Sequence, residues 1–322
     1  MSLADQRLLA ALNALNVQKD WQPLHRLHAA LRVVDDGDEP GVVAVDTHHR
    51  TATIKTWASA YRAEGRTAFF PLYSGPGRPR GATLEGMLSG RLIEEAWARE
   101  ALGSLGVGLN LHDAREQDPD PGWDFEISST AGASGGFTVD VKLHSEPFRQ
   151  AAEYTGLEPD DCVPLGIYKM LVARERQQKG GAHHVYAFMF RPSLAQDLMR
   201  ALITLPPDTR EALELLFATT APSKKRSQRR AVAAVVDKHL MTLLPLLEGS
   251  EFRLISTHRA VNLFLEKVET RAPMLRGQGQ SFGSTINMHY SWSREMTPLA
   301  TVLQGATRNL EGLLQDFQMG RM

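Results

Sequence analysis

The sequence predicts an α/β protein in which a mixed β-sheet is flanked by helices, with mainly helical segments before and after it. Three observations predict this class. Apolar residues recur at helical spacing over 84–97, two short runs near residues 125 and 140 alternate between apolar and polar, and 184–190 forms a short apolar run. At 322 residues the chain is long enough for more than one domain.

The first segment, residues 1–80, predicts a helical domain. One helix is expected over Leu24–Leu31, and a second places Ile54, Trp57 and Tyr61 on one face. The stretch Gly-Pro-Gly-Arg-Pro-Arg-Gly at 75–81 cannot continue a helix, because it holds two prolines and three glycines. We therefore place a domain boundary at residue 80.

The second segment, residues 81–200, predicts the sheet. A helix is expected from Ala82 to Leu102 and a short strand over 107–111. Two alternating runs follow, joined by the glycine-rich segment 131–136, and an antiparallel hairpin is the simplest connection between them. One face of this hairpin is apolar, with Trp123, Phe125 and Ile127 on the first strand and Phe137, Val139, Val141 and Leu143 on the second.

The third segment, residues 201–322, predicts a mainly helical C-terminal domain that contacts DNA or forms a dimer. Helices are expected over 194–205, 209–217, 230–247 and 296–317, and shorter strands over 252–256 and 284–292.

Composition restricts the class of protein and of metal site. Hydrophobic residues make up 43% and charged residues 23%, as in ordinary globular proteins. No apolar stretch is long enough to span a bilayer and the N-terminus has no signal layout, so we expect a cytoplasmic protein without a membrane partner. Cys162 is the only cysteine, which excludes an internal disulfide and a thiolate cluster. Any metal must bind oxygen or imidazole.

Charge is distributed unevenly although the net charge is only −1. The three segments carry net charges of +2, −7 and +4 in chain order, with histidine counted as neutral. An acidic middle between basic ends is typical of a carboxylate metal site flanked by segments that bind nucleic acid. Chance variation of a mixed surface is an equally simple interpretation.

The polar face of the predicted hairpin gathers the residues with the clearest chemistry. Asp124 and Glu126 lie on its first strand and Asp140 and Lys142 on its second. Mg²⁺ binds one or two carboxylates together with waters and substrate phosphates, and a neighbouring ammonium can stabilise the charge that develops during phosphodiester hydrolysis. The alternative is a solvated sheet face whose charges pair across strands.

The order of these residues resembles the PD-(D/E)XK nuclease superfamily. Asp124 matches its first aspartate, and in Thr-Val-Asp-Val-Lys-Leu at 138–143, Asp140 matches the second acid and Lys142 the lysine. The resemblance covers about residues 90–145 and implies a restriction-endonuclease-like core with Mg²⁺ as cofactor, for which Mn²⁺ can substitute. It also implies an acid from the preceding helix, for which Glu94 is favoured and Glu95 is the alternative.

Several positions depart from the pattern or remain secondary. Trp123 stands where a proline often precedes the first aspartate, and Asp118 and Asp120 near Pro121 are rivals to Asp124. Four further residues are secondary candidates for a role at the site: Glu95, Glu126, His144 and Gln150.

Three segments are candidates for DNA binding. The run around 43–65 resembles the helix-turn-helix near the start of many transposases, which implies that Lys55 and Arg62 face the DNA; a helical packing domain is the alternative. Gly-Arg-Pro-Arg, with Arg78 and Arg80, resembles an AT-hook, although a plain linker also explains it. The last of these candidates is the run 224–230, which carries five cations in seven residues, namely Lys224, Lys225, Arg226, Arg229 and Arg230.

We therefore expect a Mg²⁺-dependent DNA endonuclease with catalytic residues Glu94, Asp124, Asp140 and Lys142, the three acids binding the metal. A restriction or phage-defence endonuclease fits the layout, and cutting both strands implies a homodimer. The alternative from another class is a DNA-binding regulator or transposition accessory protein that does not cleave. A glycosidase with paired carboxylates would not explain Lys142 or the basic segments.

Overall fold

The computed structural model describes residues 22–64, 84–114, 123–130, 135–144, 155–166, 181–218, 225–269 and 287–322, with a few single positions and pairs between them. Its internal contacts divide the chain into two units. The first contains residues 1–78, 165–169 and 263–289, and the second contains 79–164, 170–262 and 290–322. Among the described residues, none of the helices has the length and apolar character needed to cross a bilayer.

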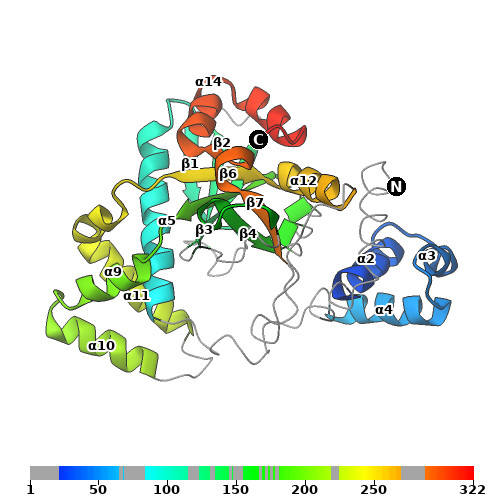
Figure 1. The fold of residues 1–322 in the computed structure, drawn as a ribbon, viewed down its shortest axis with the longest axis horizontal. Coiled ribbons are helices and arrows are strands. Elements are labelled where there is room, and N and C mark those ends of the chain that lie inside the picture. Colours follow the sequence, from blue (N-terminus) through cyan, green and yellow to red (C-terminus); the bar gives the residue numbers. More distant parts are fainter. Residues whose placement is uncertain are drawn as a thin grey trace. The chain divides into compact units, whose positions relative to one another are not determined.

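The described N-terminal residues of the first unit form three helices, α2 (Gln22–Val34), α3 (Pro40–Asp46) and α4 (Thr51–Glu64) (Figure 1). Their common core contains Ala29, Val43, Ala44 and Ile54, against which Val33 and Trp57 pack. The helix expected over 24–31 is thus confirmed, as is the inward position of Ile54. Proline suits the first turn of α3, because the amide hydrogen that it lacks would have no partner there.

A buried arginine stabilises this group of helices. The Arg32 side chain is only 3% exposed, and its guanidinium binds Asp38 at 2.6 Å and Asp46 at 2.9 Å. Because a guanidinium presents several donors in a fixed plane, it can hold both carboxylates at once. The end of α2 is thereby tied to the start and the end of α3.

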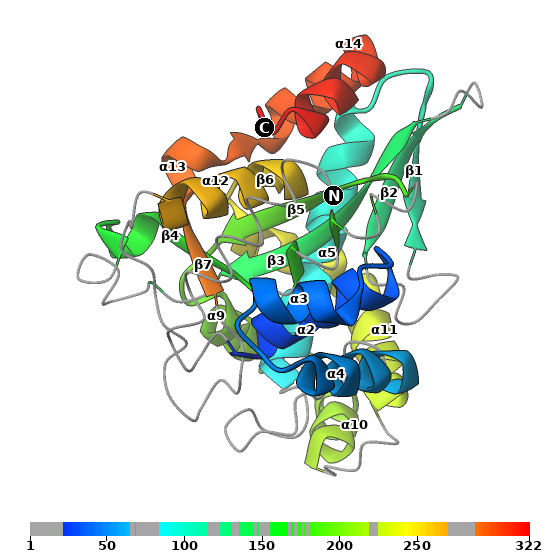
Figure 2. The same ribbon diagram turned by 90° about the vertical axis from the view of Figure 1, so that its right-hand side faces the viewer.

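The second unit contains a six-stranded sheet in the order β1-β2-β3-β5-β6-β8 (Figure 2). Only the β3–β5 pair is parallel, so the sheet is mixed as predicted. The strands are β1 (Leu109–Asp113), β2 (Phe125–Ser129), β3 (Gly136–His144), β5 (His183–Phe190), β6 (Phe252–Ser256) and β8 (Thr297–Pro298). Two further strands, β4 (Cys162–Gly166) and β7 (Asn287–Ser291), pair with each other.

The other helices of the described residues follow along the rest of the chain. They are α5 (Leu84–Ser104), α9 (Leu194–Leu202), α10 (Pro207–Ala218), α11 (Lys225–Leu243), α12 (Thr257–Glu269), α13 (Trp292–Glu295) and α14 (Leu299–Gln318), with the 3-10 turns η3 (Pro159–Asp161) and η5 (Leu244–Leu247). The predicted hairpin and the buried strand are confirmed. The helix predicted over 82–102 is α5 and the strand predicted over 107–111 is β1, each two residues later than expected.

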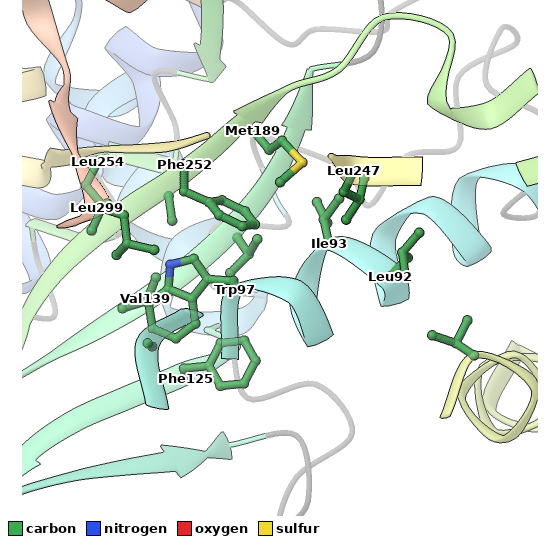
Figure 3. Close-up of a cluster of buried hydrophobic side chains, with 14 of the residues drawn as sticks. Leu92, Ile93, Trp97, Phe125, Val139, Met189, Leu247, Phe252, Leu254 and Leu299 are labelled. Atoms are coloured by element: carbon green, nitrogen blue, oxygen red, sulfur yellow. The ribbon is translucent and has the colours of Figure 1, made fainter. Parts of the chain in front are cut away.

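One large core joins the sheet to its helices (Figure 3). Trp97 of α5 is fully buried and stacks on Phe125 of β2, with ring centroids 4.8 Å apart. Around this pair lie side chains from β3, β5, β6 and α14, including Val139, Met189 and Leu254. Removing a ring as large as that of Trp97 would cost about 3–5 kcal/mol, so α5 is held tightly to the sheet.

The boundary expected at residue 200 runs through this core. β6 pairs with β5, and β8 pairs with β6, so strands from the expected helical domain complete the sheet. Buried residues of α11 and α14, such as Val236 and Leu303, belong to the same cluster as Trp97. The division at residue 200 was wrong because helices and strands that follow it bury their apolar faces on the sheet rather than on one another.

Candidate active site

The polar side chains of the β2–β3 hairpin lie opposite its apolar core. Phe137 and Val139 of β3 are fully buried in the core and Val141 nearly so, which leaves Thr138, Asp140 and Lys142 on the other face. This alternation confirms the apolar and polar faces predicted for the second strand of the hairpin.

Asp124 occupies a bend immediately before β2 and is fixed by three hydrogen bonds. Its backbone N–H donates to the carbonyl of Val139 at 2.8 Å, and its carbonyl accepts the N–H of Ala114 at 3.1 Å. Its carboxylate Oδ2 accepts the backbone N–H of Val141 at 2.7 Å. Since Phe125 lies opposite Val139 in the ladder, Asp124 is brought beside Asp140.

Asp140 and Lys142 form an ion pair along β3. The Lys142 Nζ donates to Asp140 Oδ1, and the two side chains are 29% and 13% exposed, respectively. Residues two apart on a strand point to the same face, which explains why the Asp-Val-Lys spacing permits this pair. The ammonium and the carboxylate are therefore partly withdrawn from water but still accessible.

Glu94 of α5 joins this group, whereas Glu95 does not. Glu94 is close enough to raise the pKa of Asp124 and of Lys142 electrostatically. Glu95 forms a 2.6 Å ion pair with Arg91 one turn earlier, and Arg91 also binds Asp237 of α11 at 3.1 Å. Neighbouring residues on a helix point about 100° apart, so only one of the two glutamates can face Asp124.

The environment of Asp124 opposes its ionisation. Burial is the largest influence, followed by the nearby carboxylates of Glu94 and Asp140, and together they raise the pKa of Asp124 to about 7. The Lys142 ammonium and the hydrogen bond from the Val141 amide act in the opposite direction but are outweighed. Three crowded acids with one cation leave excess negative charge that a second cation would neutralise.

Lys142 is held as a cation. Burial alone would favour the neutral amine, but Asp140, Asp124 and Glu94 outweigh it and the pKa of Lys142 is raised. A protonated lysine cannot remove a proton from water, although it can donate hydrogen bonds to phosphate oxygen. The geometry thus favours electrostatic stabilisation over a role as general base.

The side chains present suit a hard divalent cation. Within the described ranges, no three acidic, histidine or cysteine side chains are already arranged around a common metal position. Mg²⁺ does not require a closed cage, because it commonly binds one or two carboxylates and retains several waters. The oxygen donors of Asp124 and Asp140, with Glu94 nearby, fit such an open site, and Mn²⁺ accepts the same donors.

Two secondary candidates have other neighbours. Glu126 lies opposite His112 of β1 and Thr138 of β3, and it is not among the groups that shift the pKa of Asp124. The His144 ring stacks on Phe190 with centroids 5.1 Å apart. Burial lowers the pKa of His144 to about 4, partly opposed by a hydrogen bond with the Cys162 backbone. A neutral, packed imidazole does not serve as a phosphate-binding cation.

The structure adds polar residues of β5 that the sequence reasoning did not select. In the parallel β3–β5 register, Thr138 lies opposite His184 and Asp140 lies opposite Tyr186. Thr138 Oγ1 and His184 Nδ1 are 2.7 Å apart, and the His184 ring meets Tyr186 edge-on with centroids 4.7 Å apart. The two polar positions in an otherwise apolar run, His184 and Tyr186, were the available signal.

The predicted DNA-binding residues that the structure describes lie on two helices. Lys55 and Arg62 are exposed on α4. Lys225, Arg226 and Arg229 belong to the first turns of α11, and Arg230 beside them is exposed. Six other predicted positions lie outside the described residues. They are the DNA-binding candidates Arg78, Arg80 and Lys224, the secondary candidate Gln150, and Asp118 and Asp120, the rivals of Asp124.

Comparisons with known proteins leave this chemistry as the basis for any functional assignment. The chain matches no family model, and no curated protein or solved structure is significantly similar to it.

Proposed function

We propose that the protein is a Mg²⁺-dependent endodeoxyribonuclease with a PD-(D/E)XK-type core. The observation that carries this proposal is the convergence of Glu94, Asp124, Asp140 and Lys142 from α5, the bend before β2, and β3. The mixed sheet flanked by helices is compatible with such a core. Phosphodiester hydrolysis needs acids to bind a metal and a cation to stabilise phosphate charge, and both are supplied here.

Each residue has a distinct role in this proposal. Asp124 and Asp140 bind the metal, and Glu94 supplies a third carboxylate from α5. The bound cation would supply charge neutralisation and lower the pKa of a coordinated water. Lys142, kept protonated by these acids, donates hydrogen bonds to a non-bridging phosphate oxygen. The Val141 amide donates to one oxygen of the Asp124 carboxylate and so fixes its orientation.

DNA is the proposed polymer, with restriction or phage defence as the proposed biological setting and a homodimer as the state that cuts both strands. The basic start of α11 supports a polyanionic substrate, because cations at a helix N-terminus oppose the helix dipole and are stabilised by phosphate. The competing proposal is a DNA-binding regulator or transposition accessory protein in which the same sheet only supports the fold.

Incubating the purified full chain with plasmid DNA tests the proposal. Wild-type protein is expected to nick or linearise the plasmid with Mg²⁺ or Mn²⁺ and not with EDTA. Asp140→Asn should abolish cleavage and Lys142→Ala should slow it by about 10²-fold or more, whereas Asp237→Asn, which removes a carboxylate from α11, should leave it nearly unchanged. If wild type binds the plasmid but never cuts it with either metal, the regulator is the better assignment.

A further inference from the structure

Two histidines meet where the β5–β6 ladder ends. The two strands are antiparallel, with Val185 opposite Ser256. Continuing this register by two residues places His183, the first residue of β5, opposite His258 in the first turn of α12. The centroids of the two rings are 6.1 Å apart, and the His183 ring is 6.5 Å from the ring of Phe317 at the end of α14. Strand pairing therefore brings together two imidazoles that are far apart in the sequence.

Each of these rings has a hydrogen-bond donor for a solute. Among the described residues, the Nδ1 atoms of His183 and His258 are buried without a hydrogen-bond partner. A proton on Nδ1 would find no acceptor there, so we expect the neutral rings to carry their proton on Nε2. Both side chains are partly exposed, so the Nε2–H groups can donate to a solute at this position.

The charged groups near the pair are cationic. Burial is the largest cause of the lowered pKa of both histidines, and for His258 the next causes are His183 and Arg174. Arg174 is only 9% exposed, so its charge is close to His258 and weakly screened by water. No carboxylate is among the groups that shift the pKa of either ring. Asp316, the last acid of α14, is bound to Arg321 at 2.9 Å.

This chemistry favours an anion over a metal ion. Imidazoles bind transition metals, but the Arg174 guanidinium repels a cation, and in the described part of the chain no third metal-binding side chain completes a site. One phosphate oxygen can accept N–H groups from both rings if the two nitrogens are within about 6 Å, which a centroid separation of 6.1 Å permits. An anion would also favour protonation of the rings. The N-terminal end of α12, where His258 lies, has the same preference for negative charge.

We infer that His183, His258 and Arg174 form a phosphate-binding site separate from the candidate active site. His183 pairs with Phe137, whose side chain lies in the core, whereas Asp140 lies on the opposite face of the sheet and about 10 Å further along β3. The ligand is a phosphate dianion, either free or as the terminal phosphate of a nucleotide. The inference uses none of the residues proposed for cleavage and does not depend on that function.

The test measures binding of inorganic phosphate to the full chain in EDTA by isothermal titration calorimetry. His183→Ala and His258→Ala should each weaken phosphate binding by about tenfold or more, because each removes a hydrogen bond to a charged group. Nuclear magnetic resonance titration of the wild-type rings should show that saturating phosphate raises the pKa of both histidines. This second measurement needs no variant and so does not depend on how well a variant folds.

Two further arms examine the charge and the source of the phosphate. Sulfate keeps its double negative charge, so its affinity should rise as the pH falls from about 8 to about 6 and the rings become protonated. His258→Gln keeps a donor that does not titrate, and its sulfate affinity should depend less on pH. Tighter binding of a nucleoside 5′-monophosphate than of inorganic phosphate would identify a nucleotide as the ligand, and equal affinities would identify free phosphate.

His239 of α11 provides a matched control. Like the two histidines of the site, it has a buried ring nitrogen without a hydrogen bond to any described residue. His239→Ala should leave phosphate affinity unchanged, and circular dichroism should show unchanged helix content in every variant. The inference would be overturned if phosphate left the titration of both wild-type rings unchanged, or if His183→Ala and His258→Ala bound phosphate as tightly as wild type. Plasmid cleavage is measured separately, and neither result would alter it.

Discussion

The carboxylate of Asp124 accepts the backbone N–H of Val141 at 2.7 Å, which fixes the first acid of the candidate site against the strand that carries the other two groups. Val141 stands between Asp140 and Lys142, so a single amide sets the position of Asp124 relative to both. The same arrangement leaves Asp124 buried beside two other carboxylates, and its pKa rises to about 7. A site that suits a cation is therefore unfavourable when the cation is absent.

Asp124→Asn is expected to stabilise the metal-free protein at alkaline pH. Between about pH 4 and pH 7 the folded state keeps a proton on Asp124 that the unfolded state has released, so the free energy of unfolding falls as the pH rises. Asparagine avoids this loss, and the gain at pH 8 should be about 2–4 kcal/mol. Urea denaturation in EDTA measures it.

The same experiment has an internal control in pH. At pH 4 the wild-type Asp124 is protonated in the folded state, and the variant should show little advantage. Asp237→Asn, at a side chain that is 51% exposed, should change stability little at either pH. An Asp124→Asn protein that is less stable than wild type at pH 8 would contradict the proposed crowding of carboxylates.

Two adjacent glutamates of α5 allow a matched comparison. Glu94→Gln removes an acid that interacts with Asp124 and should lower the cleavage rate by about 10²-fold, because the metal loses one of its carboxylates. Glu95→Gln breaks the ion pair with Arg91, a partly exposed contact worth about 0.5 kcal/mol, and should leave the rate nearly unchanged. Rates are measured on plasmid DNA over a range of Mg²⁺ concentrations. Equal effects of the two changes would remove Glu94 from the site.

Much of this site could be predicted because it depends on local periodicity. The alternation around Asp124 and Asp140 identified the hairpin, its apolar face and the polar face opposite. Glu94 was an expectation from the PD-(D/E)XK resemblance, which implies an acid on the preceding helix, and Glu95 remained as the alternative. Spacing of two residues on a strand is preserved whatever the rest of the fold does, so the Asp140–Lys142 pair followed from the sequence.

The rest of the fold depends on contacts between distant segments. β5 follows β3 in the sheet although about 40 residues separate them, and β6 joins β5 after several helices. The local sequence pattern of Phe252–Ser256 does not indicate which strand β6 pairs with. The boundary at residue 200 was misplaced for this reason. β5 is buried on both faces and its sequence is mostly apolar. The sequence pattern therefore did not indicate that His184 and Tyr186 lie beside the polar face of β3.

Lys142→Arg is expected to lower the cleavage rate although it keeps the positive charge. Lysine is a compact cation that fits beside Asp140, whereas the planar guanidinium is larger and binds carboxylates side-on. Both Lys142→Arg and Lys142→Ala should lower the cleavage rate by about 10²–10³-fold through lost stabilisation of phosphate charge. Anisotropy in EDTA should show that DNA affinity changes much less than the rate. Full activity of the arginine variant would mean that any positive charge suffices at this position.

His144 should make the protein sensitive to acid. Its pKa is lowered to about 4, so below about pH 6.5 the unfolded state takes up a proton that the folded state excludes. The free energy of unfolding should therefore fall by about 3 kcal/mol between pH 6.5 and pH 4 because of this residue. His144→Gln keeps a polar side chain that does not titrate. The free energy of unfolding of this variant should therefore fall less between pH 6.5 and pH 4 than that of wild type. Nuclear magnetic resonance titration of the His144 ring gives an independent reading, and a midpoint near 6.5 in the folded protein would contradict the buried, neutral imidazole stacked on Phe190.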